Sequence, residues 1–252
     1  MPHAPIRLHC DMTGEYGGGE LELFADATNW KAYVAGHITP HVTGRVLEVG
    51  AGIGSNIANL TNGKVTDWLA LEPDPQLTAE IERKSRDGDL PPFCRIMTGT
   101  LDDIPSHERF DTILYVDVLE HIDDDRSEVD KAARLLALGG RLVVLAPAHQ
   151  FLFSAFDRSI GHFRRYNMPS LRALTPVGCR VVRLFMLDSA GFFLSLANRV
   201  ILRSAMPTKS QIAIWDRMVV PISRIADWLS GFCFGKTVVI VWQATAGIDA
   251  RR

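Results

Sequence analysis

The feature that most constrains the fold is a short apolar run that passes directly into a glycine-rich loop, GRVLEVGAGIG over residues 44–54. A run that is apolar throughout and ends in glycines is typical of a parallel strand buried on both faces and followed by a tight turn. The next segment, SNIANLTNG, has helical spacing, with Ser55 as a candidate N-cap. Together they predict the strand, loop and helix that open a β-α-β unit.

Strands and helices then alternate as far as residue 147. Expected strands lie within DWLALEPD, FCRIMTGTLDDIP, FDTILYVDVLEHI and RLVVLAPA. Expected helices are PQLTAEIERKSRDG, stopped by Gly88, and DRSEVDKAARLLALGG, stopped by Gly139 and Gly140. This rhythm predicts an α/β fold with a Rossmann-like, doubly wound and mostly parallel sheet. Such sheets bind ligands beyond the carboxyl ends of their strands, where the glycines and several acids fall.

The composition excludes several classes of protein. A chain of 252 residues that is 47% hydrophobic can bury one full core without a second domain. The net charge of −2 gives no general attraction to nucleic acid, so we expect no nucleic-acid partner. The four cysteines lack CxxC spacing, which argues against a zinc site or a disulfide framework, and we expect no metal. Without an apolar leader or a long apolar span, the chain is expected in the cytoplasm.

The glycine loop and two acids carry the strongest chemical signal. Glycines at 50, 52 and 54 let the backbone approach a ligand, although a tight turn alone would explain them. The spacing departs from the dinucleotide pattern G-x-G-x-x-G, because Ser55 stands where its last glycine would be. Glu48 in a buried strand needs a cation or a hydrogen-bond donor facing it. Glu72 follows Gly50 by 22 residues, the distance at which an acid accepts both ribose hydroxyls.

Five linked motifs resemble the class I S-adenosylmethionine-dependent methyltransferases. They are VLEVGAGIGSNIANL, LALEPDP, GTLDDIP, FDTILYVDVLEHIDD and LLALGGRLVVLAPA, in the family's order from about Val46 to Pro147. The resemblance implies S-adenosylmethionine as cofactor and S-adenosylhomocysteine as product. The cofactor-binding set that it implies is Glu48, Gly50, Ala51, Gly52, Gly54, Glu72, Pro73, Thr100, Leu101, Val116 and Asp117.

Within that set the resemblance assigns separate roles. Glu48 and the loop would hold the methionine portion, Glu72 the ribose, and the backbone N–H of Leu101 the adenine. Many members have an acid before that residue, whereas this chain has Thr100, with Asp102 as a possible substitute. A sulfonium cofactor also suits the local charge, because acids around one loop would repel the phosphates of a dinucleotide.

Methyl transfer from a sulfonium is an in-line displacement, in which the protein aligns the reactants, excludes water and sometimes removes a proton. The candidate catalytic residues are His149, His162 and Asp117. His121 lies in LEHI, which recurs in the resembling family whatever the acceptor, so we expect a structural or cofactor-side role for it. Two other classes stay open: a non-catalytic cofactor-binding module, and a nicotinamide-dependent oxidoreductase, whose usual Tyr-x-x-x-Lys pair we do not find.

The stretch GHFRRYN, residues 161–167, follows the fifth strand and resembles a segment of one large bacterial subset of these methyltransferases. One interpretation is that Arg164 or Arg165 grips an anionic group on the acceptor while Phe163 and Tyr166 pack against its apolar part. The other is that an arginine pairs with Asp157 or with the acids at 123–125 and pins the loop. The candidate substrate-binding set is Arg164, Arg165, Phe163, Tyr166 and Trp30.

The tail departs from a minimal sheet. We expect one methyltransferase domain over 1–252, divided into an N-terminal helical cap (1–43), a cofactor-binding core (44–187), an apolar helical insert (188–235) and a final, antiparallel strand (236–246). Pro221 should kink the second helix of the insert. The insert could roof the acceptor pocket, form a homodimer interface, or lie on a membrane surface. The acceptor is expected to be a small or medium-sized, anionic or amphipathic molecule.

Overall fold

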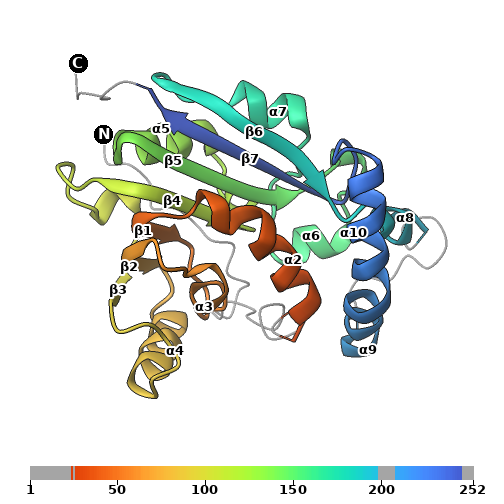
Figure 1. Cartoon of the computed structure of the whole chain (residues 1–252), viewed down its shortest axis with the longest axis horizontal. Coiled ribbons are helices and arrows are strands. Elements are labelled where there is room, and N and C mark those ends of the chain that lie inside the picture. The colour runs from red at the N-terminus through yellow and green to blue at the C-terminus, as the bar shows by residue number, and fades with distance from the viewer. Residues whose placement is uncertain (1–23, 25, 198–207, 246–252) are drawn as a thin grey trace.

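The computed structural model describes residues 24, 26–197 and 208–245, and a single sheet runs through them (Figure 1). The strand order is β3-β2-β1-β4-β5-β7-β6, and β7 runs antiparallel to both of its neighbours. This confirms the Rossmann-like α/β fold with a reversed closing strand. The strands are β1 (Gly44–Val49), β2 (Val65–Glu72), β3 (Cys94–Thr98), β4 (Phe110–Val116), β5 (Leu136–Pro147), β6 (Cys179–Leu187) and β7 (Thr237–Ala244).

Helices cover the sheet on both faces. They are α2 (Thr28–Ile38), α3 (Ile57–Leu60), α4 (Pro75–Arg86), α5 (Asp125–Arg134), α6 (Ala155–Ser159), α7 (Met168–Ala173), α8 (Ser189–Ala197), α9 (Lys209–Ile214) and α10 (Val220–Leu229). Their starts follow ordinary capping chemistry. The Asp74 side chain accepts from the N–H of Gln76 at the start of α4, and Asn167 forms a capping box with Ser170 at the start of α7.

The core is divided by the sheet into two apolar layers. Along β1, Leu47 and Val49 face one cluster, which also contains Tyr115 and Trp242, while Val46 faces the other. Neighbouring positions of the same strand are therefore buried on opposite faces. This explains why the strands of this sheet are apolar throughout rather than alternating.

One expected boundary was wrong. The helix that we expected to run as far as Gly139 and Gly140 ends at Arg134, and β5 already begins at Leu136. Backbone pairing with β4 captures this segment, because the Phe110 N–H donates to the Leu135 carbonyl at 2.9 Å. The two glycines lie inside the strand, where the backbone bulges. A Cβ on Gly140 would lie 2.8 Å from the Ala137 carbonyl oxygen.

The helices of the tail gather at one end of the molecule, beside the start of β7 (Figure 1). A π-helical turn at Trp215–Val219 joins α9 to α10, and Pro221 follows in the first turn of α10. The irregularity that the structure has here is this π-turn, and the kink expected at Pro221 stays a prediction. Within the described residues, no helix combines the length and the apolar character needed to cross a membrane.

Buried aspartates tie this end to the rest of the fold. Asp227 of α10 accepts from the Tyr33 hydroxyl of α2 at 2.8 Å and from the backbone N–H of Asp188 at 2.7 Å. Asp188 in turn accepts from the indole of Trp215 at 2.9 Å. Because β7 is antiparallel, its first residue lies at the edge where the parallel strands end. That geometry brings the tail to the same edge as the glycine loop.

Candidate functional site

A cavity of about 980 Å³ opens at the carboxyl ends of the parallel strands. The loops after β1, β2, β3, β4 and β5 line it, together with α2, α8, α9 and the residues just before β7. It is large enough for a nucleoside-sized ligand with a second molecule beside it. Most of the predicted site residues line it: Gly50, Ala51, Gly52, Glu72, Pro73, Thr100, Leu101, Val116, Asp117, His162, Arg165 and Trp30.

The glycine loop forms one wall of the cavity, and its backbone is left-handed at Gly50 and Gly52, with φ of 66° and 57°. At Gly50 a side chain is also excluded by space, because a Cβ there would lie 2.7 Å from the side chain of Val118. The loop is held against β2, since the N–H groups of Gly50 and Ala51 both donate to the Leu71 carbonyl. The result is a fixed loop with no side chain at Gly50 and Gly52, which fits the close approach of a cofactor.

Glu72 closes the base of this wall. One of its carboxylate oxygens accepts from the Gly52 N–H at 2.8 Å and the other from the Asp74 N–H at 3.0 Å. Burial raises the pKa of this carboxyl, and the two N–H donors oppose that rise. Each oxygen keeps a further lone pair and the side chain lines the cavity, so Glu72 can still accept ribose hydroxyls.

Glu48 lies beneath the loop and does not line the cavity, and neither does Gly54. Its two oxygens accept from the Asn56 side chain at 3.0 Å and from the Trp68 indole at 3.3 Å. These donors are the hydrogen-bonding partners that a buried acid in this strand was expected to require. Burial raises the pKa of Glu48 to about 7, and the two hydrogen bonds act against the rise. In this arrangement Glu48 supports the loop from below.

The loop after β3 forms the opposite wall, where Thr100 and Leu101 both line the cavity. Thr100 forms a capping box with Asp103, whose carboxylate accepts from the Thr100 N–H at 2.8 Å. Asp102, considered as a substitute for the family's acid, does not line the cavity and is paired with Lys131 at 2.6 Å. The remaining contribution of this wall is the shape and backbone of residues 99–101.

Asp117 lines the cavity directly after β4. Its backbone is left-handed, with φ of 55°, an uncommon conformation for a residue other than glycine and one that clusters at functional sites. The side chain is accessible from the cavity and enclosed by protein elsewhere. Burial raises the pKa of Asp117 to about 6, and the nearby His162, Lys236 and Arg165 limit the rise.

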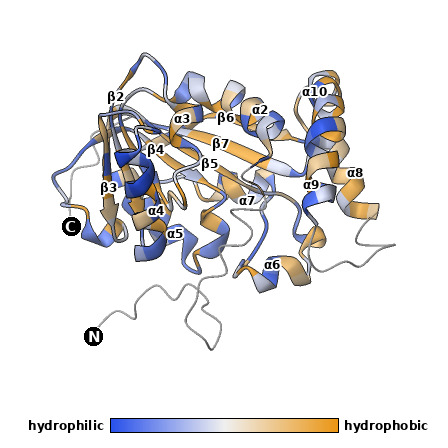
Figure 2. Cartoon of the chain, turned by 90° about the horizontal axis from the view of Figure 1, so that it is seen from below, coloured by the Kyte–Doolittle hydropathy of each residue, from blue (hydrophilic) through white to orange (hydrophobic). Residues whose placement is uncertain are grey.

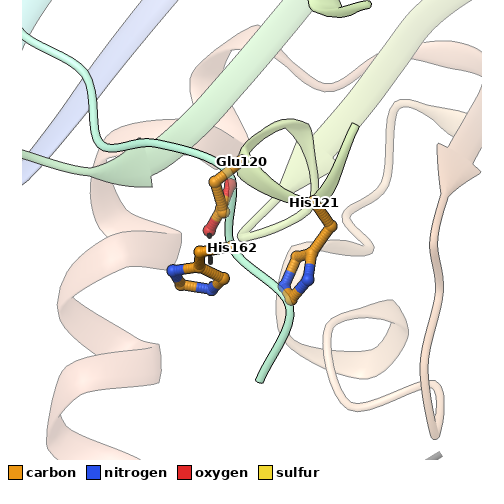
Figure 3. Close-up of side chains that lie close together, drawn as sticks. All are labelled: Glu120, His121 and His162. Carbon is orange, nitrogen blue, oxygen red and sulfur yellow. Dashed lines mark ion pairs between the residues drawn. The ribbon is translucent and has the colours of Figure 1, made fainter. Parts of the chain in front are cut away.

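The histidines at 121, 149 and 162 occupy different environments. His149 lies outside the cavity lining, with its Nε2 2.9 Å from the Gly235 carbonyl and its ring packed on Phe192. His121 and His162 both line the cavity, and their rings meet edge to face with centroids 4.5 Å apart (Figure 3). Burial and the neighbouring His162 lower the pKa of His121 to about 3.

The arginines of GHFRRYN are both engaged within the protein. Arg165 donates to both oxygens of buried Asp157, at 2.8 and 3.0 Å, and its side chain also borders the cavity. Arg164 points away from the cavity and contacts Asp125 at 2.8 Å and Asp123 at 3.3 Å. The geometry therefore matches the second interpretation, with each arginine pinning the loop to a different acid.

The two aromatics of the stretch also lie outside the cavity lining. Tyr166 is buried, and its hydroxyl contacts the Asp125 carboxylate at 2.8 Å and the Leu119 carbonyl at 3.2 Å. Phe163 is 43% exposed and packs near the Arg164 guanidinium. Neither is positioned to pack against an acceptor in this cavity. The loop around them nevertheless brings His162 and Arg165 to the site.

Sequence reasoning missed two polar residues of the site, Glu120 and Lys236. Glu120 is fully buried, and within the described part of the chain neither carboxylate oxygen has a hydrogen-bond partner on another residue. Burial and the nearby Asp117 raise its pKa well above the usual range. Lys236 lines the cavity with its ammonium 5.0 Å from the centre of the Trp215 ring. The position of Lys236 could have been inferred from the sequence, because a residue just before an antiparallel closing strand must lie at this edge of the sheet.

Comparisons with known proteins agree with the fold. Residues 47–144 match the family described as "Methyltransferase domain". Ajmaline N-methyltransferase from Rauvolfia serpentina is 24% identical over 71% of this chain and 57% of its own length. A tRNA U34 carboxymethyltransferase from Shewanella is 29% identical over 46% of this chain and 36% of its own length. The matched part of this chain thus spans between a third and three fifths of the length of these relatives.

Among solved structures, geranyl diphosphate methyltransferase in complex with S-adenosylmethionine superimposes with a TM-score of 0.61. The two chains are 13% identical, and the superposition covers 91% of each. At this identity the likeness concerns the fold. It extends beyond the matched domain to most of the chain.

Proposed function

We propose that the chain is a class I S-adenosylmethionine-dependent methyltransferase that transfers a methyl group to a small or medium-sized acceptor that is anionic or amphipathic. The observation that carries this proposal is the continuous cavity. It joins the glycine loop and Glu72 at one end to an apolar roof and a lysine at the other. A protein that only held the cofactor would have no need of the second half.

The described residues fit the cofactor. The glycine loop would hold its methionine portion, Glu72 its ribose hydroxyls, and the wall at Thr100 and Leu101 its adenine. When bound, S-adenosylmethionine supplies an electrophilic methyl group on a positively charged sulfur. Val116 and Asp117 lie between this end and the roof, where they would orient the acceptor. The carboxylate of Asp117 is the protein group placed to receive a proton from an acceptor hydroxyl or amine.

The acceptor end of the cavity has an amphipathic lining. Trp30, Leu152, Ile212 and Trp215 supply apolar surface, and Lys236 supplies a cation. Such a lining would hold the apolar part of a molecule against the roof while the ammonium contacts an anionic group. Geranyl diphosphate, after which the similar methyltransferase is named, belongs to this chemical class. The tRNA-modifying relatives make nucleic acid the competing acceptor, which the net charge of −2 disfavours.

We propose further that the protein acts in the cytoplasm and that the insert contacts a membrane surface there. The surface of α9 and α10 carries exposed apolar side chains, namely Ile214, Met218, Ile222, Ile225, Trp228 and Leu229. Figure 2 shows apolar stretches of α8 and α10 at the end remote from β2 and β3. Exposed arginines at 217 and 224 interrupt this surface, and the combination suits an interface with anionic lipid.

The membrane proposal is separated from a homodimer by one pair of measurements. Sedimentation with vesicles containing anionic lipid should retain the chain and should fail for the double variant Ile222→Ser, Ile225→Ser. Analytical ultracentrifugation without lipid should report a monomer. A dimer that the same double variant dissociates would instead assign this surface to a second copy of the chain.

The transferase proposal is tested by measuring S-adenosylhomocysteine formation with a panel of hydroxylated and amino acceptors, half of them bearing a carboxylate or phosphate. We expect turnover with anionic members, and a rise in their KM of about tenfold or more in Lys236→Met, the loss of one charged contact. Lys64→Met, at an exposed lysine, is the matched control. Turnover with tRNA alone would contradict the small acceptor. No turnover despite cofactor binding would favour the non-catalytic module.

A further inference from the structure

We infer that Glu120, His121 and His162 form a binding site for one divalent first-row transition-metal ion at the acceptor end of the cavity. The three residues offer one ligand atom each, and these atoms lie within 4.8 Å of one another. Small side-chain rotations would bring all three to metal–ligand bonds of about 2.1 Å. The inference rests on the proposed methyl transfer only for the role of the ion, not for its binding.

The strongest sign of a missing partner is Glu120. Its side chain is fully buried, and among the residues that the structure describes no other residue donates a hydrogen bond to either oxygen, although burying an unpaired carboxyl is costly whether or not it is charged. The nearest basic group is the His162 Nε2, at 3.9 Å from one oxygen. That distance is too long for a hydrogen bond and leaves room for an ion between them (Figure 3).

His162 is oriented as a metal-binding histidine would be. Its Nδ1 lies 3.2 Å from an Asp157 oxygen, which leaves the Nε2 directed toward Glu120. A carboxylate on the far nitrogen of a histidine ligand is the usual outer partner in metal sites. Asp157 is itself fixed by Arg165 and by Ser154, whose hydroxyl and N–H each donate at 2.7 Å. The conspicuous stretch GHFRRYN would thus contribute a ligand and the arginine that fixes its support.

His121 completes a set of two imidazoles and one carboxylate. Its ring lies beside that of His162, and it hydrogen bonds to the backbone of Ile160. Two histidines and one carboxylate favour a first-row transition metal over magnesium or calcium, and they leave coordination positions open. The open positions would face the cavity that all three residues line, close to Asp117. An acceptor with oxygen donors, such as a hydroxyl beside a second oxygen, could occupy them.

The test is a titration of the untagged, metal-depleted chain with Co²⁺, followed by visible absorption, without cofactor or acceptor. We expect one ion per chain, displaced by Zn²⁺, with affinity reduced by about tenfold or more in His121→Ala, His162→Ala and Glu120→Gln. His107→Ala, at an exposed histidine, should bind as the unaltered chain does. Glu120→Gln keeps the shape of the side chain, so its metal-free melting temperature should not fall.

Three results would overturn the site: no binding of Co²⁺ up to about 1 mM, binding that the three variants leave unchanged, or equal loss in His107→Ala. If one variant fails to fold, the other two decide the outcome. As an independent readout, Zn²⁺ should raise the melting temperature of the unaltered chain by more than that of Glu120→Gln. The cofactor is absent from all of these measurements, so a failure to bind metal would not contradict the transferase proposal. In the same way, a failure to find methyl transfer would not contradict the metal site.

Discussion

The two ends of the cavity differ in how completely their polar groups are paired. At the cofactor end, the acids Glu48 and Glu72 each accept two hydrogen bonds from the protein. At the acceptor end, Glu120 has no hydrogen-bond partner on another of the described residues, and Lys236 faces the ring of Trp215. The first end is organised before any ligand arrives. The second end contains the polar groups on which the proposals of an acceptor and of an ion depend.

One ion pair at the acceptor end is an exception, because both of its side chains are paired within the protein, and it allows the comparison to be tested. Asp157 and Arg165 form a buried ion pair at the acceptor end, and the two hydrogen bonds from Arg165 together with that from His162 hold the pKa of Asp157 well below its usual range despite burial. Asp157→Ala would leave the Arg165 charge enclosed and unpaired. We expect the free energy of unfolding to fall by about 3–5 kcal/mol, measured by urea denaturation.

Asp123→Ala is the matched control for this ion pair. Asp123 pairs with the adjacent arginine, Arg164, but its side chain is 82% exposed. We expect a change within about 0.5 kcal/mol. Equal effects of the two substitutions would mean that the acceptor end has no internal anchor. The segment from 148 to 166 would then depend on a ligand for its order.

The next prediction concerns the cofactor end and the dependence of its stability on pH. The pKa of Glu48 is raised by burial from 4.5 to about 7, so the folded chain binds more protons than the unfolded chain between those values. Stability contributed by this group is therefore full below pH 4.5 and decreases as the pH rises toward 7. The loss amounts to about 3 kcal/mol at most.

Glu48→Gln should remove this part of the pH dependence. We expect the difference in unfolding free energy between pH 5 and pH 8 to shrink in the variant by about 1–3 kcal/mol, because the glutamine side chain does not titrate. Urea denaturation at both pH values measures it. A variant with the same pH profile as the unaltered chain would show that Glu48 is already ionised when buried.

A smaller effect tests whether the glycine loop is as rigid as its contacts indicate. Gly50→Ala introduces a Cβ 2.7 Å from Val118 at a left-handed position, so we expect a loss of about 1–3 kcal/mol and weaker binding of S-adenosylhomocysteine. Gly63→Ala, where a Cβ meets nothing within 4 Å, should be neutral. If both behave alike, the loop yields easily and the cofactor end is not preformed.

The same contrast explains what could be predicted from the sequence. The cofactor end is built from short β-α connections, so its glycines, Glu72 and Leu101 lie in motifs that can be recognised locally. The position at which the chain departs from the family's pattern, Thr100 in place of an acid, could also be recognised from the sequence. The role of Glu48 was less accessible, because its partners Asn56 and Trp68 are set by how the helix and the second strand pack.

The acceptor end is assembled from segments far apart in the chain, and local pattern does not give their contacts. Arg164 and Arg165 could be assigned to acids or to an acceptor, and only the fold selects Asp125 and Asp157. His121 and His162 are 41 residues apart and meet because the loop after β5 crosses the end of β4. The boundary between α5 and β5 was misjudged for a similar reason, since strand pairing at Phe110 overrides helical spacing.

The central claim, a preformed cofactor end governed by Glu72, is tested most directly by calorimetry of the chain with S-adenosylhomocysteine and, separately, NADH. We predict binding of the first and not the second, weakened about 100-fold or more in Glu72→Ala because two charged hydrogen bonds are lost. Glu82→Ala, at an exposed acid of α4, should bind normally. Binding of NADH alone, or affinity for S-adenosylhomocysteine that Glu72→Ala leaves unchanged, would contradict the account.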